Sequence, residues 1–174
     1  MKLLNKTALI SLLSLSVAFL AGCPSSSEDA AQDLRAENEE LMTKLKEADE
    51  KAAEHFDNAL KMLEAKQYPA AISNIQEAVK NAPDELKEDL ASAQLEVQTE
   101  SLTAAFADAS GEAKESVEKI LTALKEGNTE DAMKAAAELQ TVAENLTDDQ
   151  KATLSALLGD AGEMIKGVSE GLGL

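Results

Sequence analysis

The chain has 174 residues and carries 33 acidic against 16 basic side chains, which gives a formal net charge of −17. A surface this acidic repels nucleic acid and anionic lipid headgroups, so it excludes functions that depend on electrostatic binding to either. The composition includes one His, one Cys and no Trp, and alanine is the commonest residue. A Cys/His metal site is therefore excluded, and a core of alanine and leucine leaves few walls for a large apolar ligand pocket.

The first 22 residues have the three parts of a secretory signal. Lys2 and Lys6 form a positive start. An apolar stretch of about 14 residues follows, shorter than the roughly 20 that a membrane-spanning helix needs. It ends in Leu20-Ala21-Gly22-Cys23. This tetrapeptide resembles the lipobox of bacterial lipoproteins, in which small residues before the cysteine fit the lipoprotein signal peptidase.

The resemblance implies that the chain is cut between Gly22 and Cys23 and that Cys23 is lipidated. In that family the thiol forms a thioether with diacylglycerol and the new amine is acylated, so we expect covalent lipid and no other cofactor. The mature chain 23–174 loses Lys2 and Lys6 and no acidic residue, so its formal charge falls from −17 to −19. The acyl chains, rather than electrostatic attraction, would then hold it on the membrane.

Two other interpretations of this segment stay open. A plain secretory signal would leave Cys23 as an unpaired thiol, which is unusual in an oxidising compartment. An uncleaved membrane helix would be too short and lacks a stop-transfer flank. In enteric bacteria an Asp after the lipidated cysteine favours retention in the inner membrane, whereas this chain has Pro24. The resemblance therefore implies an outer-membrane protein that faces the periplasm, if the source is Gram-negative.

After Cys23 the sequence predicts an all-α fold, because it has no sustained apolar/polar alternation and few β-branched residues. We expect a long N-terminal helix that is partly coiled-coil-like, followed by antiparallel helical hairpins. The expected division of the mature chain is the lipidated Cys and a polar tether at 23–30, a coiled-coil-like helix at 31–51, a helical-hairpin domain at 52–170 and a frayed tail at 171–174.

One helix is predicted from Ser27 to about Gln67, with apolar or small residues in two heptad series. These are Ala31, Asn38, Leu45, Ala52 and Ala59, and Leu34, Leu41, Ala48, His55 and Met62. They match the a and d positions of a coiled coil, where a buried Asn can fix register and oligomeric state. The series therefore predicts either self-association through 31–62 or an amphipathic helix that packs on its own domain.

Five further helices are predicted. One starts at Tyr68-Pro69 and ends before Pro83, the next spans about 84–108, and a third spans about 112–126. The apolar face of 84–108 drifts along the helix, which indicates a bend near Glu100-Ser101 or burial on two sides. Asn128, with Asp131 three residues on, predicts the cap of the following helix. Thr147 to Gln150 is typical of a capping box that starts the last helix, whose apolar stripe includes Ala161, Ile165 and Val168.

Residues 52–83 contain a pattern of small and apolar residues that ends in a proline. Its members are Ala59, Tyr68, Ala71, Ile72, Ile75, Ala78, Val79 and Pro83. The pattern resembles a tetratricopeptide repeat, in which small residues let two antiparallel helices approach and a proline ends the repeat. The first helix departs from it at His55, Asn58 and Met62. A second, repeat-like hairpin lies 61 residues later, where Leu60, Leu63, Ala71 and Ile72 align with Leu121, Leu124, Ala132 and Met133.

No set of residues predicts catalysis, so we expect a protein that is not an enzyme. His55, the only histidine, is expected to be structural rather than a ligand or base. The acidic pairs Glu130-Asp131 and Asp148-Asp149 stand where helices begin, where capping and the helix dipole explain them. The anchor, the tether and the hairpins together predict a membrane-held protein-interaction module with an unknown protein partner. The alternative is a structural spacer whose segment 31–62 forms a coiled-coil stalk.

Overall fold

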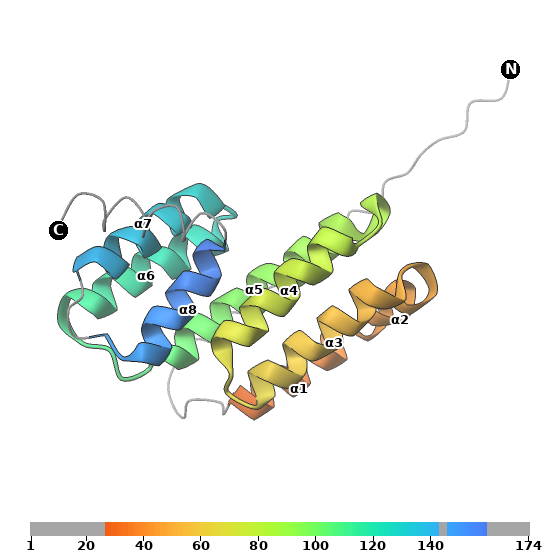
Figure 1. The fold of residues 1–174 in the computed structure, drawn as a ribbon, viewed down its shortest axis with the longest axis horizontal. Coiled ribbons are helices and arrows are strands. Elements are labelled where there is room, and N and C mark those ends of the chain that lie inside the picture. Colours follow the sequence, from red (N-terminus) through yellow and green to blue (C-terminus); the bar gives the residue numbers. More distant parts are fainter. Residues whose placement is uncertain (1–26, 143–145, 160–174) are drawn as a thin grey trace, which may run out of the picture.

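A computed structural model describes residues 27–142 and 146–159. Within these residues the chain forms eight α helices and one short 3-10 helix, η1, with no strand (Figure 1). The elements are α1 (Ser27–Glu37), α2 (Glu39–Ala48), α3 (Glu50–Glu64), α4 (Tyr68–Asn81), η1 (Asp84–Leu86), α5 (Lys87–Ala105), α6 (Gly111–Lys125), α7 (Thr129–Val142) and α8 (Asp148–Leu158). The prediction of an all-α fold is confirmed for this part of the chain.

The single helix predicted from Ser27 to about Gln67 is wrong, because the chain leaves helical geometry at Asn38 and Asp49. Asn38 has φ −103° and ψ 17°, and its side-chain amide donates a hydrogen bond to the Leu34 carbonyl at 3.0 Å. Asp49 is extended, with φ −152° and ψ 103°, and its carboxylate accepts the Ala52 N–H at 2.8 Å. Asp49 thus caps α3, and the chain reverses there, so that α1 and α2 lie against α3 (Figure 1).

An ion pair joins α1 to α3, the helices before and after this reversal of the chain. Arg35 on α1 lies 2.6 Å from Asp57 on α3, and Lys61 reaches the other oxygen of Asp57 at 2.7 Å. Burial raises the pKa of Asp57, but the hydrogen bonds and charges of Lys61 and Arg35 outweigh it and hold this pKa below its ordinary value. Asp57 therefore stays ionised and ties α1 to α3.

The α3–α4 and α6–α7 hairpins have the same turn at the 61-residue offset. Lys66 and Gly127 adopt positive φ angles of 59° and 70° just after the helix end. In each turn two N–H groups donate back to helix carbonyls, in the geometry of a Schellman motif. The pairs are Lys66 to Leu63 (3.0 Å), Gln67 to Met62 (2.8 Å), Gly127 to Leu124 (2.9 Å) and Asn128 to Ala123 (2.8 Å). The 61-residue offset between the two hairpins in the sequence is therefore also present in their backbone hydrogen bonds.

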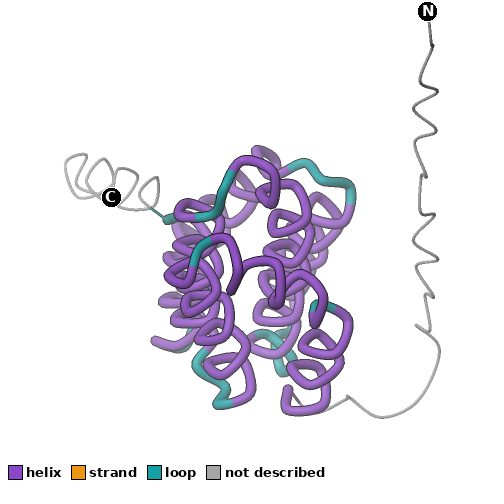
Figure 2. The backbone as a smooth tube through the Cα atoms, turned by 90° about the vertical axis from the view of Figure 1, so that its right-hand side faces the viewer, coloured by secondary structure: helices purple, strands orange, loops and turns teal. Residues whose placement is uncertain are grey.

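Helix α5 is shared by two hydrophobic cores. Leu90, Ala93 and Val97 pack into the first core, with α1 to α4, while Leu95 and Leu102 pack into the second, with α6 to α8. The helix is continuous over 87–105, so the drift of its apolar face means burial on two sides. Figure 2 shows the described residues as helices joined by short loops, with no strand among them.

Helix α8 returns from the second core to contact α4 and α5. Its first turn has the predicted capping box between Thr147 and Gln150, and the Gln150 amide also donates to the Ala105 carbonyl at 3.2 Å. At its other end the Gln76 amide of α4 donates to the Ala156 carbonyl at 3.1 Å. Since α8 is hydrogen-bonded to both halves, it fixes the hairpins α3–α4 and α6–α7 in one body.

The structure also bears on the expected division of the chain. Residues 27–30, expected in the polar tether at 23–30, form the first turn of α1. The first core runs from Ala31 to Val97 and so crosses the boundary expected between 31–51 and 52–170. The tail 171–174 and the stripe residues Ala161, Ile165 and Val168 lie outside the described residues.

Candidate interaction surfaces

The predicted processing and lipidation residues, Gly22 and Cys23, lie outside the described residues, so they remain predictions. Among the described helices, none is both long enough and apolar enough to cross a membrane. No group of three or more His, Cys, Asp or Glu side chains is placed to hold a metal ion within 27–142 and 146–159.

His55 lies between the two helices of the first hairpin. Its ring atom Nδ1 is 3.4 Å from Oδ1 of Asn74, which connects α3 to α4, and the side chain is half-buried. This contact supports the structural role that the sequence predicted for His55.

Both predicted acidic pairs stand in the first turn of a helix. Glu130 and Asp131 begin α7, and Asp148 and Asp149 begin α8. The Asp131 N–H donates to Oδ1 of Asn128 at 3.2 Å, so Asn128 caps α7 as predicted. Carboxylates at these positions stabilise the positive end of the helix dipole.

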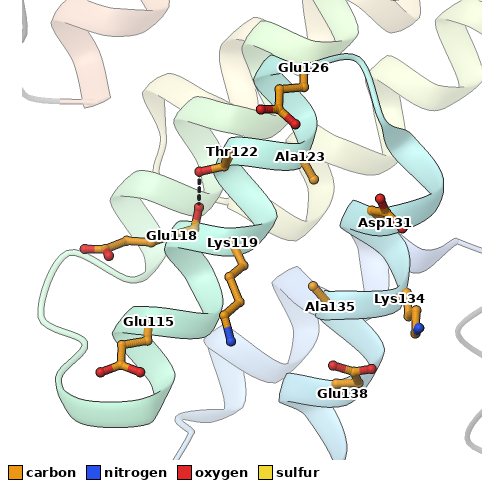
Figure 3. A pocket seen from close by; sticks show the side chains of 10 residues that line it. All are labelled: Glu115, Glu118, Lys119, Thr122, Ala123, Glu126, Asp131, Lys134, Ala135 and Glu138. Carbon is orange, nitrogen blue, oxygen red and sulfur yellow. Dashed lines mark hydrogen bonds between the residues drawn. The ribbon is translucent and has the colours of Figure 1, made fainter.

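The second hairpin has an open groove along its outer face, between α6 and α7 (Figure 3). Two lysines, Lys119 and Lys134, stand among five carboxylates that line it: Glu115, Glu118, Glu126, Asp131 and Glu138. Thr122 lies in the middle of the α6 wall, where its hydroxyl donates to the Glu118 carbonyl at 2.8 Å. The excess of carboxylates makes the groove favourable for a cationic group.

A second hollow lies where the two cores meet. It has a volume of about 350 Å³ and is lined by residues of α4, α5, α6, the α6–α7 turn, α7 and the end of α8. Its polar residues are Gln76, Gln94 and Gln98, and no lining residue is charged. The size is at the lower end of the range for small-molecule sites. The alanine- and leucine-rich composition predicted few walls for a large apolar pocket, and this small, partly open hollow does not contradict that prediction.

Two polar residues of α5 are buried, and one of them has a buried side-chain atom without a hydrogen-bond partner among the described residues. Gln98 lines the cavity and is 4% exposed. Ser101, one turn further along α5, is completely buried, and its Oγ has no partner. Sequence reasoning missed both residues. The available signal was Gln94 and Gln98 four residues apart, on a helix expected to be buried on two sides.

The same helix carries two half-buried carboxyl groups, Glu96 and Glu100. Burial raises the pKa of Glu100. Burial also raises the pKa of Glu96, by more than the hydrogen bond from the Asn38 amide (3.4 Å) lowers it. Both groups lie in surroundings that disfavour their charge.

Comparison with known proteins finds no family model, no curated protein and no solved structure that matches this chain.

Proposed function

We propose that this protein is a lipoprotein of the bacterial cell envelope, held on a membrane by lipid on Cys23, that acts as a protein-interaction module without enzymatic activity. The motif Leu20-Ala21-Gly22-Cys23 supports the anchor. In a Gram-negative source, Pro24 favours the periplasmic face of the outer membrane. Because α1 begins at Ser27, the helical body would start only a few residues from the lipid.

The observation that carries the interaction role is the open groove on the α6–α7 hairpin. This hairpin shares the register and turn of α3–α4, whose sequence resembles a tetratricopeptide repeat, a type of hairpin that binds partner segments in its grooves. The carboxylates along the groove indicate a partner segment rich in lysine or arginine.

The anchor is tested by Cys23→Ser in cells. We expect the parent protein to fractionate with membranes and to incorporate labelled fatty acid. The variant should lose both properties, because its hydroxyl cannot be processed as the thiol is. Unchanged membrane retention and signal cleavage in the variant would overturn the lipoprotein assignment.

The interaction role is tested by photo-crosslinking in cells. Thr122 is replaced by a photoreactive benzoyl-phenylalanine, and the matched control places it at Thr43 of α2, which is also exposed and also donates to the carbonyl four residues earlier. We expect a discrete crosslinked protein from Thr122 only. Charge reversal at Glu115 and Glu118 should remove it. Equal crosslinking from both positions, or none at Thr122, would contradict the groove as the binding surface.

A further inference from the structure

Helix α1 buries less apolar surface than α2, the helix that follows it. α1 lies against α3 and α5 (Figure 1). Among residues 29–37, Ala31 alone is buried, and Leu34 is half-buried. α2 has nearly the same length and buries two leucines, Leu41 and Leu45. Because the free energy of burial grows with the apolar area removed from water, α1 is the more weakly packed of the two helices.

An ion pair near the end of α1 fixes it to α3. Arg35 lies 2.6 Å from Asp57, and both side chains are partly exposed to solvent. Exposed ion pairs of this kind contribute little to stability. Asp57 has a second partner, because Lys61 of the same helix reaches its other oxygen at 2.7 Å. The pair with Arg35 therefore holds α1 in place, whereas α3 keeps its own ion pair when α1 leaves.

Asn38 marks the point at which α1 can separate from the body. Its backbone leaves helical geometry, with φ −103° and ψ 17°. Its side-chain amide donates to Oε2 of Glu96 on α5 at 3.4 Å, so this residue is tied to the body. α2 begins at the next residue, and its two buried leucines keep it packed when α1 leaves. An isolated helix of 11 residues is marginal in water, so released α1 unfolds.

We infer that α1 is a releasable strap, which separates from α3 and α5 at Asn38 while the rest of the body stays folded. Its consequence for function rests on the proposed lipid anchor at Cys23. With α1 in place, residues 24–26 join the lipid to the body and span at most about 11 Å. With α1 released, residues 24–37 join them and span at most about 50 Å. The strap therefore sets how far the body and its α6–α7 groove reach from the membrane.

The test is hydrogen–deuterium exchange of residues 23–174 with Cys23→Ser, measured amide by amide by NMR. The exchange rate of a hydrogen-bonded amide reports how often its helix opens. We expect the amides of α1 to exchange together, at least about 100-fold faster than those of α3. Fraying from Ser27 would instead give a gradient, with the slowest exchange next to Asn38.

The decisive variant is Arg35→Ala, which removes the ion pair to Asp57. It should speed exchange in α1 by about 2- to 5-fold and leave α3 unchanged. Lys44→Ala is the matched control and should leave α1 unchanged, because the ion pair of Lys44 with Glu40 lies within α2. Leu34→Ala should speed exchange in α1 by about 5- to 10-fold, because packing is lost while helix propensity is kept.

Three results would overturn the inference. The first is exchange in α1 as slow as in α3, which would show that α1 opens only when the whole body unfolds. The second is a gradient of exchange from Ser27, which would show fraying rather than release. The third is unchanged exchange of α1 in both Arg35→Ala and Leu34→Ala. Because exchange is measured without lipid, its outcome is independent of the fractionation experiment that tests the anchor.

Discussion

Glu96 and Glu100 lie one turn apart on α5, and both are half-buried. Burial raises the pKa of each carboxyl above its ordinary value. Between pH 4.5, the ordinary pKa, and the raised pKa, the folded protein therefore binds more protons than the unfolded chain. Across that window, the free energy of unfolding falls as the pH rises.

We expect Glu100→Gln to unfold at a higher temperature than the parent at pH 7, because the amide has no charge to desolvate. The variant should also lose part of the parent's decline in stability as the pH rises above the ordinary pKa of 4.5. Thermal unfolding followed by circular dichroism over that range measures both effects.

The control is Glu54→Gln, which removes one negative charge from an exposed position on α3. This control measures how much stability is gained simply by reducing charge repulsion in a chain with a formal charge of −17. If both variants flattened the pH profile equally, net charge rather than burial of Glu100 would be the cause, and the prediction would fail.

At the scale of elements, the two hairpin turns use one backbone geometry with different residues at the position of positive φ. Gly127 adopts it without strain, whereas Lys66 has a Cβ that disfavours it. A Cβ added at Gly127 would meet nothing within 4 Å, so substitution there costs only backbone strain. The two turns therefore form a matched pair for testing backbone strain.

We expect Lys66→Gly to raise the free energy of unfolding by about 0.5–1 kcal/mol. Gly127→Lys should lower it by about 1 kcal/mol for the same reason. Urea denaturation measures both. The double variant has the parent's composition and charge, so it separates backbone strain from charge. Effects of the same sign in the two single variants would contradict this account.

The start of α8 offers a second test at this scale. Thr147 accepts the Gln150 N–H, and the Gln150 side chain accepts the Thr147 N–H in return. Thr147→Ala should cost about 1 kcal/mol of stability, whereas Thr147→Ser should cost little because the hydroxyl remains. If serine and alanine destabilised the protein equally in urea denaturation, the hydroxyl would not be the stabilising group.

Sequence patterns predicted the helix starts, helix stops and caps that depend on residues close together in the chain. The helix start at Pro69, the stop before Pro83 and the caps at Asn128 and Thr147 are all present. The break at Asp49 was missed, because a heptad series is the same whether its partner is another chain or the chain's own next helix. The cavity could not be predicted either, since it depends on contacts such as Gln76 to Leu157, 81 residues apart.

For the molecule as a whole, the central question is what the heptad residues of 31–62 pack against. Leu45, Ala52 and Ala59 are completely buried, and Leu41 is 7% exposed, all in the chain's own first core. Those side chains are not available for a seam with a second copy. Ala48, which a coiled coil would bury at a d position, is exposed at the end of α2.

We therefore expect residues 23–174 with Cys23→Ser to be a monomer in sedimentation experiments, with a melting temperature that does not depend on protein concentration. Leu45→Ala should cost about 2–5 kcal/mol, because it leaves a cavity in the core. Ala48→Lys, three residues on, should change stability by less than about 0.5 kcal/mol, because it adds a charge at an exposed position.

The coiled-coil stalk makes the opposite prediction for each measurement. Its melting temperature would rise with protein concentration, because folding and association would be one step. A lysine at position 48 would lie in the seam and would weaken it strongly. A dimer that Ala48→Lys dissociates would therefore show that 31–62 pairs between copies, and would favour the spacer over the interaction module.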